Sequence, residues 1–179
     1  ILHISFCVMF FSNTLSLYFP IRNRNMFYRG SSRYIYSRHK VDQKQKEIKG
    51  KGTITFVQFD DQYELNYDFL PIENAPLLTN ETYKPRGLTA LLDAIGRTID
   101  STGKQLAALS ESERPSRVIF VIQTDGQENS SKEYISSPKP NEYWDKGARI
   151  RDMIKHQQEA YNWDFVFLGA GQDAIATAT

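Results

Sequence analysis

The chain has 179 residues, of which 40% are hydrophobic, and its 22 basic and 21 acidic side chains leave a formal net charge of +1. A chain of this length and composition is expected to form one domain around a single hydrophobic core. Its one cysteine, Cys7, excludes an internal disulfide framework and agrees with a reducing cytoplasm, where we expect the protein to reside.

The first part of the chain differs from the rest in charge. Residues 1–52 carry ten Lys and Arg against two Asp and Glu, whereas residues 53–179 carry twelve against nineteen. Such asymmetry can indicate a basic arm that binds an anionic surface. The apolar stretch 1–19 could also serve as a signal segment or a marginal membrane span, but no basic region precedes it and polar residues dilute it. We therefore treat residues 1–41 as a divergent N-terminal segment and expect neither specific nucleic-acid binding nor a membrane role.

From residue 42 onward, the pattern alternates between strands and helices. The Asp60-Asp61-Gln62 turn between two strand-like runs predicts a hairpin. A later run, 117–123, is too continuously apolar for anything but a buried strand. The polar stretch 130–143 is expected to form an exposed excursion. The expected elements are, in chain order, strands 53–59 and 63–67, a helix over 90–109, a strand over 117–123, a helix over 143–161 and a last strand over 165–170.

Two loops in this series place oxygen-bearing side chains at the ends of elements. Thr89 stands just before the expected helix 90–109, and Asp125 stands just after the expected strand 117–123. In open α/β sheets, ligands bind outside the carboxyl ends of the strands, so both residues are candidate ligands. Two structural interpretations stay open, because Thr89 could cap the helix and Asp125-Gly126 could form a turn.

The residues around both loops form long matches to one family. Residues 85–96 read Pro-Arg-Gly-Leu-Thr-Ala-Leu-Leu-Asp-Ala-Ile-Gly, and residues 124–129 read Thr-Asp-Gly-Gln-Glu-Asn. From about residue 44 to residue 178, the chain resembles the von Willebrand factor A (VWA) family, nearest to its stand-alone bacterial and phage members. The resemblance implies a Rossmann-like α/β fold with a mostly parallel central sheet, one antiparallel edge strand and helices on both faces. Residues 42–179 would form this VWA-like domain, truncated at its C-terminus.

The family's metal-ion-dependent adhesion site binds Mg²⁺, or a similar cation such as Mn²⁺, through oxygen ligands. The resemblance makes Thr89 the ligand from the second loop and Asp125 the ligand from the third. The family's first loop, Asp-x-Ser-x-Ser, is missing, because no Asp or Glu precedes Asp42. Since Mg²⁺ affinity depends on carboxylates, we expect weak binding or none.

Two alignments could replace the missing first loop. One takes 4–8 as the first strand, and the ligand positions then fall on Met9, Phe11 and Asn13. The other, which we prefer, takes 15–19 as the strand. In that alignment Ile21 replaces the key carboxylate, while Asn23 and Asn25 offer only amide oxygens as weak metal ligands.

The sequence carries no sign of an enzyme. It has no Walker loop and no Gly-x-Ser-x-Gly elbow, and its three histidines are far apart. We expect a non-enzymatic domain that binds a protein partner, through an acidic residue of that partner if metal is bound. The partner-facing residues would be Gly87, Leu88, Gly126 and Glu128. The alternatives are a degraded or frame-shifted family member without metal-dependent binding, and a membrane-anchored member held by residues 1–19.

Overall fold

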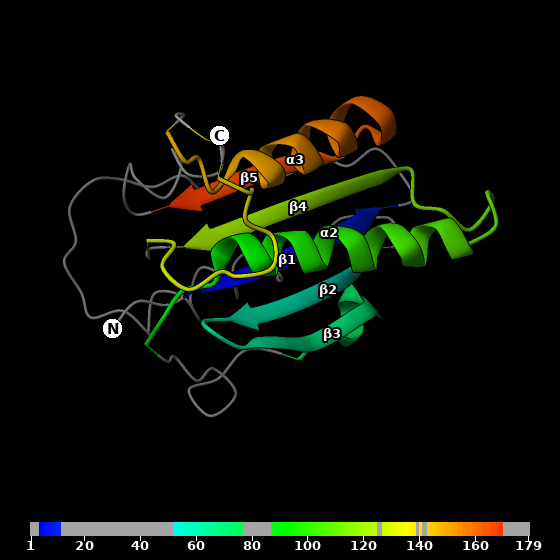
Figure 1. Ribbon diagram of the computed structural model, residues 1–179. Helices are drawn as coiled ribbons and strands as arrows, with labels where there is room; N and C mark the ends of the chain where they lie inside the picture. The colour runs from blue at the N-terminus through cyan, green and yellow to red at the C-terminus, as the bar shows by residue number, and fades with distance from the viewer. Residues whose placement is uncertain are drawn as a thin grey trace.

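The computed structural model describes residues 4–11, of which only the backbone is considered, and residues 52–76, 87–124, 127–138, 140 and 143–169. These residues form an α/β arrangement of strands and helices (Figure 1). The elements are β1 (Ile4–Phe11), β2 (Gly52–Phe59), β3 (Tyr63–Pro71), the 3₁₀ helix η1 (Ile72–Asn74), α2 (Leu91–Ala108), β4 (Arg117–Thr124), α3 (Ala148–Tyr161) and β5 (Asp164–Gly169).

Most of the expected elements are confirmed. The hairpin is present as β2 and β3, and the helix, the buried strand and the last strand correspond to α2, β4 and β5. The second expected helix begins five residues later than predicted, at Ala148 instead of 143, because the preceding residues form a loop. These elements follow the sequence closely because their apolar residues recur with a clear strand or helix period.

The five strands form one sheet in the order β3-β2-β1-β4-β5. The central strand is Ile4–Phe11, which corrects our preference for 15–19 as the first strand; residues 15–19 lie outside the described residues. Our preference depended on the spacing of Arg22 and Met26. The uncharged run Ile-Ser-Phe-Cys-Val-Met-Phe-Phe is the better central strand, because it is the longer unbroken apolar stretch.

The direction of β1 also differs from the expectation. It pairs antiparallel with both β2 and β4, so β2 and β4 run in the same direction, and β5 runs parallel to β4. With β2 and β3 also antiparallel, the β4–β5 pair is the one parallel pairing among the described strands. The expected mostly parallel pairing is therefore wrong for β1, whose direction a strand pattern alone does not encode.

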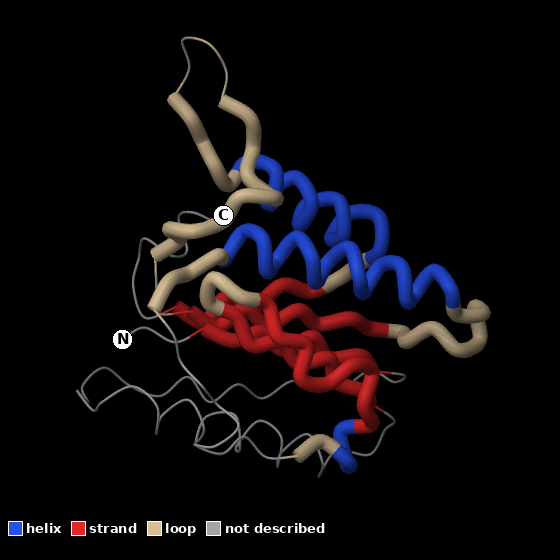
Figure 2. Tube along the Cα trace, turned by 60° about the horizontal axis from the view of Figure 1, so that its bottom comes forward, coloured by secondary structure: helices blue, strands red, loops and turns tan. Residues whose placement is uncertain are grey.

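The two α-helices of the described part pack on the same face of the sheet (Figure 2). Alternate residues of β4 supply both faces: Phe120 and Ile122 point to the helices, and Ile119 and Val121 to the other side. On that second face, the described residues place η1, with Ile72 buried in a smaller cluster. The expected helices on both faces are thus seen on one face only within the described ranges.

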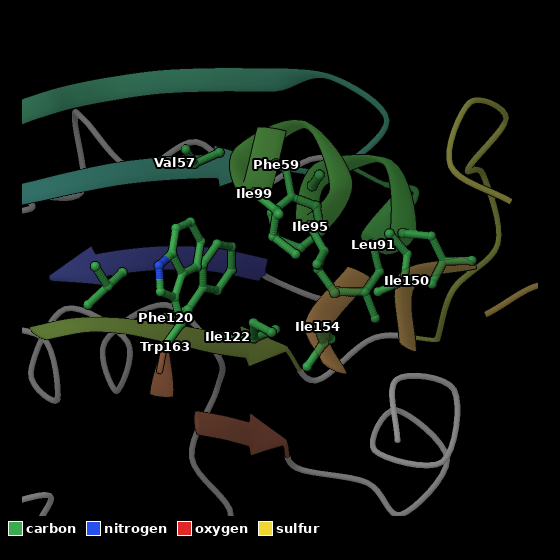
Figure 3. Close-up of a cluster of buried hydrophobic side chains, with 13 residues drawn as sticks. Val57, Phe59, Leu91, Ile95, Ile99, Phe120, Ile122, Ile150, Ile154 and Trp163 are labelled. Carbon is green, nitrogen blue, oxygen red and sulfur yellow. The ribbon is translucent and has the colours of Figure 1, made fainter. Parts of the chain in front are cut away.

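The main core lies between the helices and the sheet (Figure 3). On α2, Leu91, Ile95 and Ile99 recur at every fourth position and are almost fully buried. These three side chains belong to the same buried cluster as Phe120 of β4 and Ile150 of α3. Full burial of each such side chain contributes about 1.5–3 kcal/mol, so this layer fixes where α2 begins relative to the sheet.

Candidate functional site

The carboxyl ends of β2, β4 and β5 lie at one edge of the sheet, and α2 begins at the same edge (Figure 1). A hydrogen bond joins the turn after β2 to the start of α2: the backbone N–H of Ala90 donates to the carbonyl of Asp60 at 2.6 Å. The Asp60 carboxylate in turn accepts from the N–H of Gln62, at 2.7 Å, and fixes the turn after β2. The sheet edge expected to carry a ligand site is therefore also where α2 is anchored.

Thr89 joins the loop before α2 to the loop after β4. Its backbone N–H donates to Oδ1 of Asn129 at 2.8 Å, and its carbonyl accepts from the N–H groups of Asn129 and Ser130 at 3.0 and 3.1 Å. Thr89 is only 3% exposed, so these bonds are shielded from water. The structure therefore brings Thr89 to the segment that directly follows Asp125 and Gly126, which themselves lie outside the described residues.

Glu128 holds the same loop and caps α2. Its Oε1 accepts from the N–H groups of Ser130 and Ser131, and its Oε2 accepts from the Ser131 hydroxyl and from the N–H of Leu92 at 3.1 Å. The N-cap residue of α2 is Ala90, which has no side-chain cap bond, so the alternative role of Thr89 as a helix cap is wrong. The helix start is satisfied by a carboxylate from another loop, which also complements the helix dipole.

Asp93 makes the densest contact between α2 and the loop. Its carboxylate accepts three backbone N–H bonds, from Lys132, Glu133 and Tyr134, each at 2.8 Å. The side chain is buried, and the N–H of Asp93 itself donates to the hydroxyl of Ser131. Asp93 lies within the run 85–96 that matches the family, and the sequence predicted no role for it. An acidic residue between the apolar positions Leu92 and Ile95 of the expected helix was the signal that could have identified it.

Tyr134 packs directly on Gly96 of α2. Its hydroxyl donates to Asp100 at 2.7 Å, and the guanidinium carbon of Arg149 lies 4.6 Å from the ring centroid. Burial, followed by the hydrogen bond to the Asp100 carboxylate, raises the pKa of Tyr134 to about 12. The prediction that 130–143 is an exposed loop is therefore wrong for Tyr134 and Ile135, because both side chains pack against the core.

The remaining predicted site residues fall into two groups. Gly87 and Leu88 are exposed at this edge, and 49% of Leu88 faces solvent. Asn23 and Asn25 lie outside the described residues. The structure therefore presents a braced edge with an apolar side chain on its surface, which we call the Leu88 platform: residues 87–90 together with 127–131.

The donor set for a metal ion is incomplete in this part of the chain. No group of three or more His, Cys, Asp or Glu side chains that could bind a metal occurs within the described residues. The nearby carboxylates of Asp93 and Glu128 accept backbone hydrogen bonds. Mg²⁺ prefers oxygen ligands that include carboxylates, so the described residues alone do not fit it.

Comparisons with known proteins found no relative of this chain. No family model, curated protein or solved structure matches it. In the described ranges, no helix is long and apolar enough to cross a membrane. Eight residues of the apolar stretch 1–19 form β1.

Proposed function

We propose that this chain is a VWA-like domain of Rossmann type that binds a protein partner at the Leu88 platform without catalysing a reaction. The observation that carries the proposal is the bonding of Thr89 to Asn129 and Ser130. It joins the two loops in which the resemblance puts the binding site. The common direction of β2 and β4 and the hydrogen bond from Ala90 to Asp60 also support it, since together they put both loops at one carboxyl edge of the sheet.

A partner surface here would combine an apolar contact with rigid surroundings. Leu88 is half exposed, whereas its neighbour Thr89 is buried and bonded to the opposite loop. A side chain held by a rigid backbone loses little conformational entropy on binding, which favours affinity. Gly87, Gly126 and Glu128 would border this contact, and Glu128 would also keep the loop in shape through its bonds to Ser130 and Ser131.

We infer that the binding is independent of metal, because the first-loop carboxylate is missing and the described carboxylates of the platform are engaged in hydrogen bonds. Isothermal titration of Mg²⁺ and Mn²⁺ into the protein tests this point, with Asp125→Ala as the control. We expect no saturable heat up to millimolar cation. Saturable binding that disappears in Asp125→Ala would contradict the metal-free proposal and restore the adhesion mechanism.

Partner binding itself is testable with selected peptides. Random peptides displayed on phage would be selected on the unmodified protein, and their affinity then measured for two variants. Leu88→Ser changes the platform, and Leu65→Ser changes an equally exposed leucine (49%) on β3, away from the platform. We expect Leu88→Ser to weaken binding at least about tenfold and Leu65→Ser to leave it unchanged, with EDTA without effect. Equal losses in both variants, or no selectable peptide, would sink the proposal.

A second candidate is a family member that has lost the adhesion site. The antiparallel direction of β1 favours it, because the family resemblance implies a parallel first strand followed by the first metal loop. For this candidate we expect no heat of binding when Mg²⁺ or Mn²⁺ is titrated, and no peptide selected on the protein that binds at the platform.

A further inference from the structure

A cavity of about 450 Å³ lies at the end of the sheet opposite to the Leu88 platform. The C-terminal halves of α2 and α3 bound it, together with the segment 114–117 that leads into β4. Since β4 begins beside the cavity and ends at the platform, the two sites are separated by the length of this strand. The volume lies within the range of about 300–1,000 Å³ that is typical of small-molecule sites.

Part of the cavity wall is apolar. Leu106 of α2, Val118 of β4 and Trp163 line it, and the last two are each only 5% exposed. Gly103 also lines it, and a Cβ atom built on this glycine would meet no atom within 4 Å. An apolar ring would therefore suit this part of the space.

The charge around the cavity is positive. Its lining includes Arg114, Arg117 and His156 but no Asp or Glu. Of these, Arg117 forms an ion pair with Asp164 at 2.7 Å, which leaves Arg114 without a carboxylate partner among the described residues. The Arg114 guanidinium, in a lining without Asp or Glu, favours an anion.

The helix ends do not reverse this charge. Carbonyl groups at the end of a helix carry partial negative charge, which would repel an anion. Here the Nε of Arg114 donates to the carbonyls of Leu106 and Leu109, at 3.1 and 3.3 Å. At the end of α3, the N–H groups of Asn162 and Trp163 donate to carbonyls of the last turn. The carbonyls of Leu106 and Leu109, and those of Gln157 and Gln158, are thus already hydrogen-bonded.

We propose that this cavity binds a small aromatic carboxylate, with its ring against Trp163 and Leu106 and its carboxylate toward Arg114. The guanidinium suits this role because its planar array of donors can serve the helix carbonyls and a carboxylate together. The proposal is independent of partner binding at the platform, since the two sites share no residue.

The test uses 2-naphthoate as the probe and the indole N–H resonance of Trp163 as the reporter. The chain has two tryptophans, so Trp144→Phe leaves a single indole signal in the NMR spectrum. Trp144 donates its indole N–H to the carbonyl of Ser136 and does not line the cavity. We expect a saturable shift of the Trp163 signal with a dissociation constant on the order of 0.1–1 mM. No saturable shift up to 10 mM naphthoate would overturn the proposal.

Two comparisons of affinity complete the test. The first asks whether naphthoate binds in the cavity and not elsewhere, and the second asks whether its carboxylate contributes in addition to its ring. Gly103→Leu fills the space that the glycine leaves open and should weaken binding at least about tenfold, whereas Gly103→Ala adds one methyl group and should change it less than about threefold. The neutral 2-naphthamide, tested on the protein without a cavity substitution, should bind at least about fivefold more weakly than naphthoate. Unchanged affinity in a folded Gly103→Leu variant, or equal affinity for the amide, would overturn the proposal.

Discussion

At the scale of single residues, two glycines of the same helix have opposite surroundings. Both lie inside α2, where glycine is usually about 1 kcal/mol worse than alanine. A Cβ built on Gly96 would overlap the ring of Tyr134, whereas a Cβ on Gly103 would meet nothing within 4 Å. One glycine is thus required by a close contact and the other is not, a difference that helix propensity cannot reveal.

The first prediction concerns this pair. Gly96→Ala should lower the free energy of unfolding by about 1–3 kcal/mol, because the Tyr134 ring must move away from the helix. Gly103→Ala is the matched control and should raise the free energy by about 0.5–1 kcal/mol. Urea unfolding followed by circular dichroism measures both values. A stabilising Gly96→Ala would show that the ring does not rest on this glycine.

A second prediction at this scale concerns the ionisation of Tyr134. Its pKa is raised from the ordinary 10.0 to about 12, so the folded protein keeps the phenolic proton longer than the unfolded chain does. The resulting stability is complete below pH 10 and is lost as the pH rises toward 12. The contribution should stay below about 1 kcal/mol, because solvent screens the partly exposed Tyr134–Asp100 pair.

Tyr134→Phe provides the comparison, since it keeps the ring on Gly96 and removes the ionisable group. The free energy of unfolding of the unmodified protein should fall more between about pH 10 and pH 12 than that of the variant. Identical falls would mean that Tyr134 ionises in the same range in the folded and unfolded chains.

At the scale of elements, the loop after β4 is held to α2 mainly by side-chain carboxylates. Glu128 bonds to the helix start, and Asp93 bonds back from the helix to residues 132–134. The loop therefore has a fixed shape despite its polar sequence. Its backbone groups have the partners that regular secondary structure would otherwise supply.

Replacement of Asp93 tests this arrangement. Asp93→Ala leaves three backbone N–H groups without their acceptor and should lower the free energy of unfolding by about 2–4 kcal/mol. Asp152→Ala, an exposed aspartate of α3, is the control and should change it by less than about 0.5 kcal/mol. Hydrogen exchange of the amides of residues 132–134 should accelerate in the first variant alone. Unchanged exchange there would refute the role of Asp93.

The sequence predicted the elements better than the contacts between them. The periodicity of Val118, Phe120 and Ile122 identifies β4, and that of Leu91, Ile95 and Ile99 identifies α2. In contrast, neither the role of Asp93 nor the contact of Tyr134 with Gly96 follows from a period, because the partners are about 40 residues apart in the chain. The platform was predicted through the positions of Thr89 and Asp125, but the bonds of Thr89 to Asn129 and Ser130 required the structure.

At the scale of the whole molecule, β1 connects the two halves of the sheet. It pairs with β2 on one side and with β4 on the other, so the β2–β3 hairpin and the β4–β5 pair are joined through it. Local patterns could not predict this pairing, since a strand sequence does not specify its direction or its partners. The position of β1 therefore gives the fold a directly testable register with β2 and β4.

An engineered cross-link provides that test. Cys7 lies opposite Val121 in the antiparallel register, and opposed residues of such strands are close enough for a disulfide. Val121→Cys should therefore form an intramolecular disulfide with Cys7 under mild oxidation. Ile119→Cys lies opposite Met9, two residues away, and should react much more slowly. Equal rates in both variants, measured by mass spectrometry, would contradict this register.

The position of β1 also determines the order in which the protein can fold. Phe11 pairs with Gly52 and with Arg117, so the chain must close loops of roughly 40 and 105 residues before the central strand has both neighbours. Such long closures slow folding. During synthesis, the uncharged strand Ile4–Phe11 emerges before both of its neighbours, and its pairing is complete only after β4 has been made. Until then its apolar residues and unpaired backbone can pair with other chains, so aggregation of nascent protein should compete with folding at this strand.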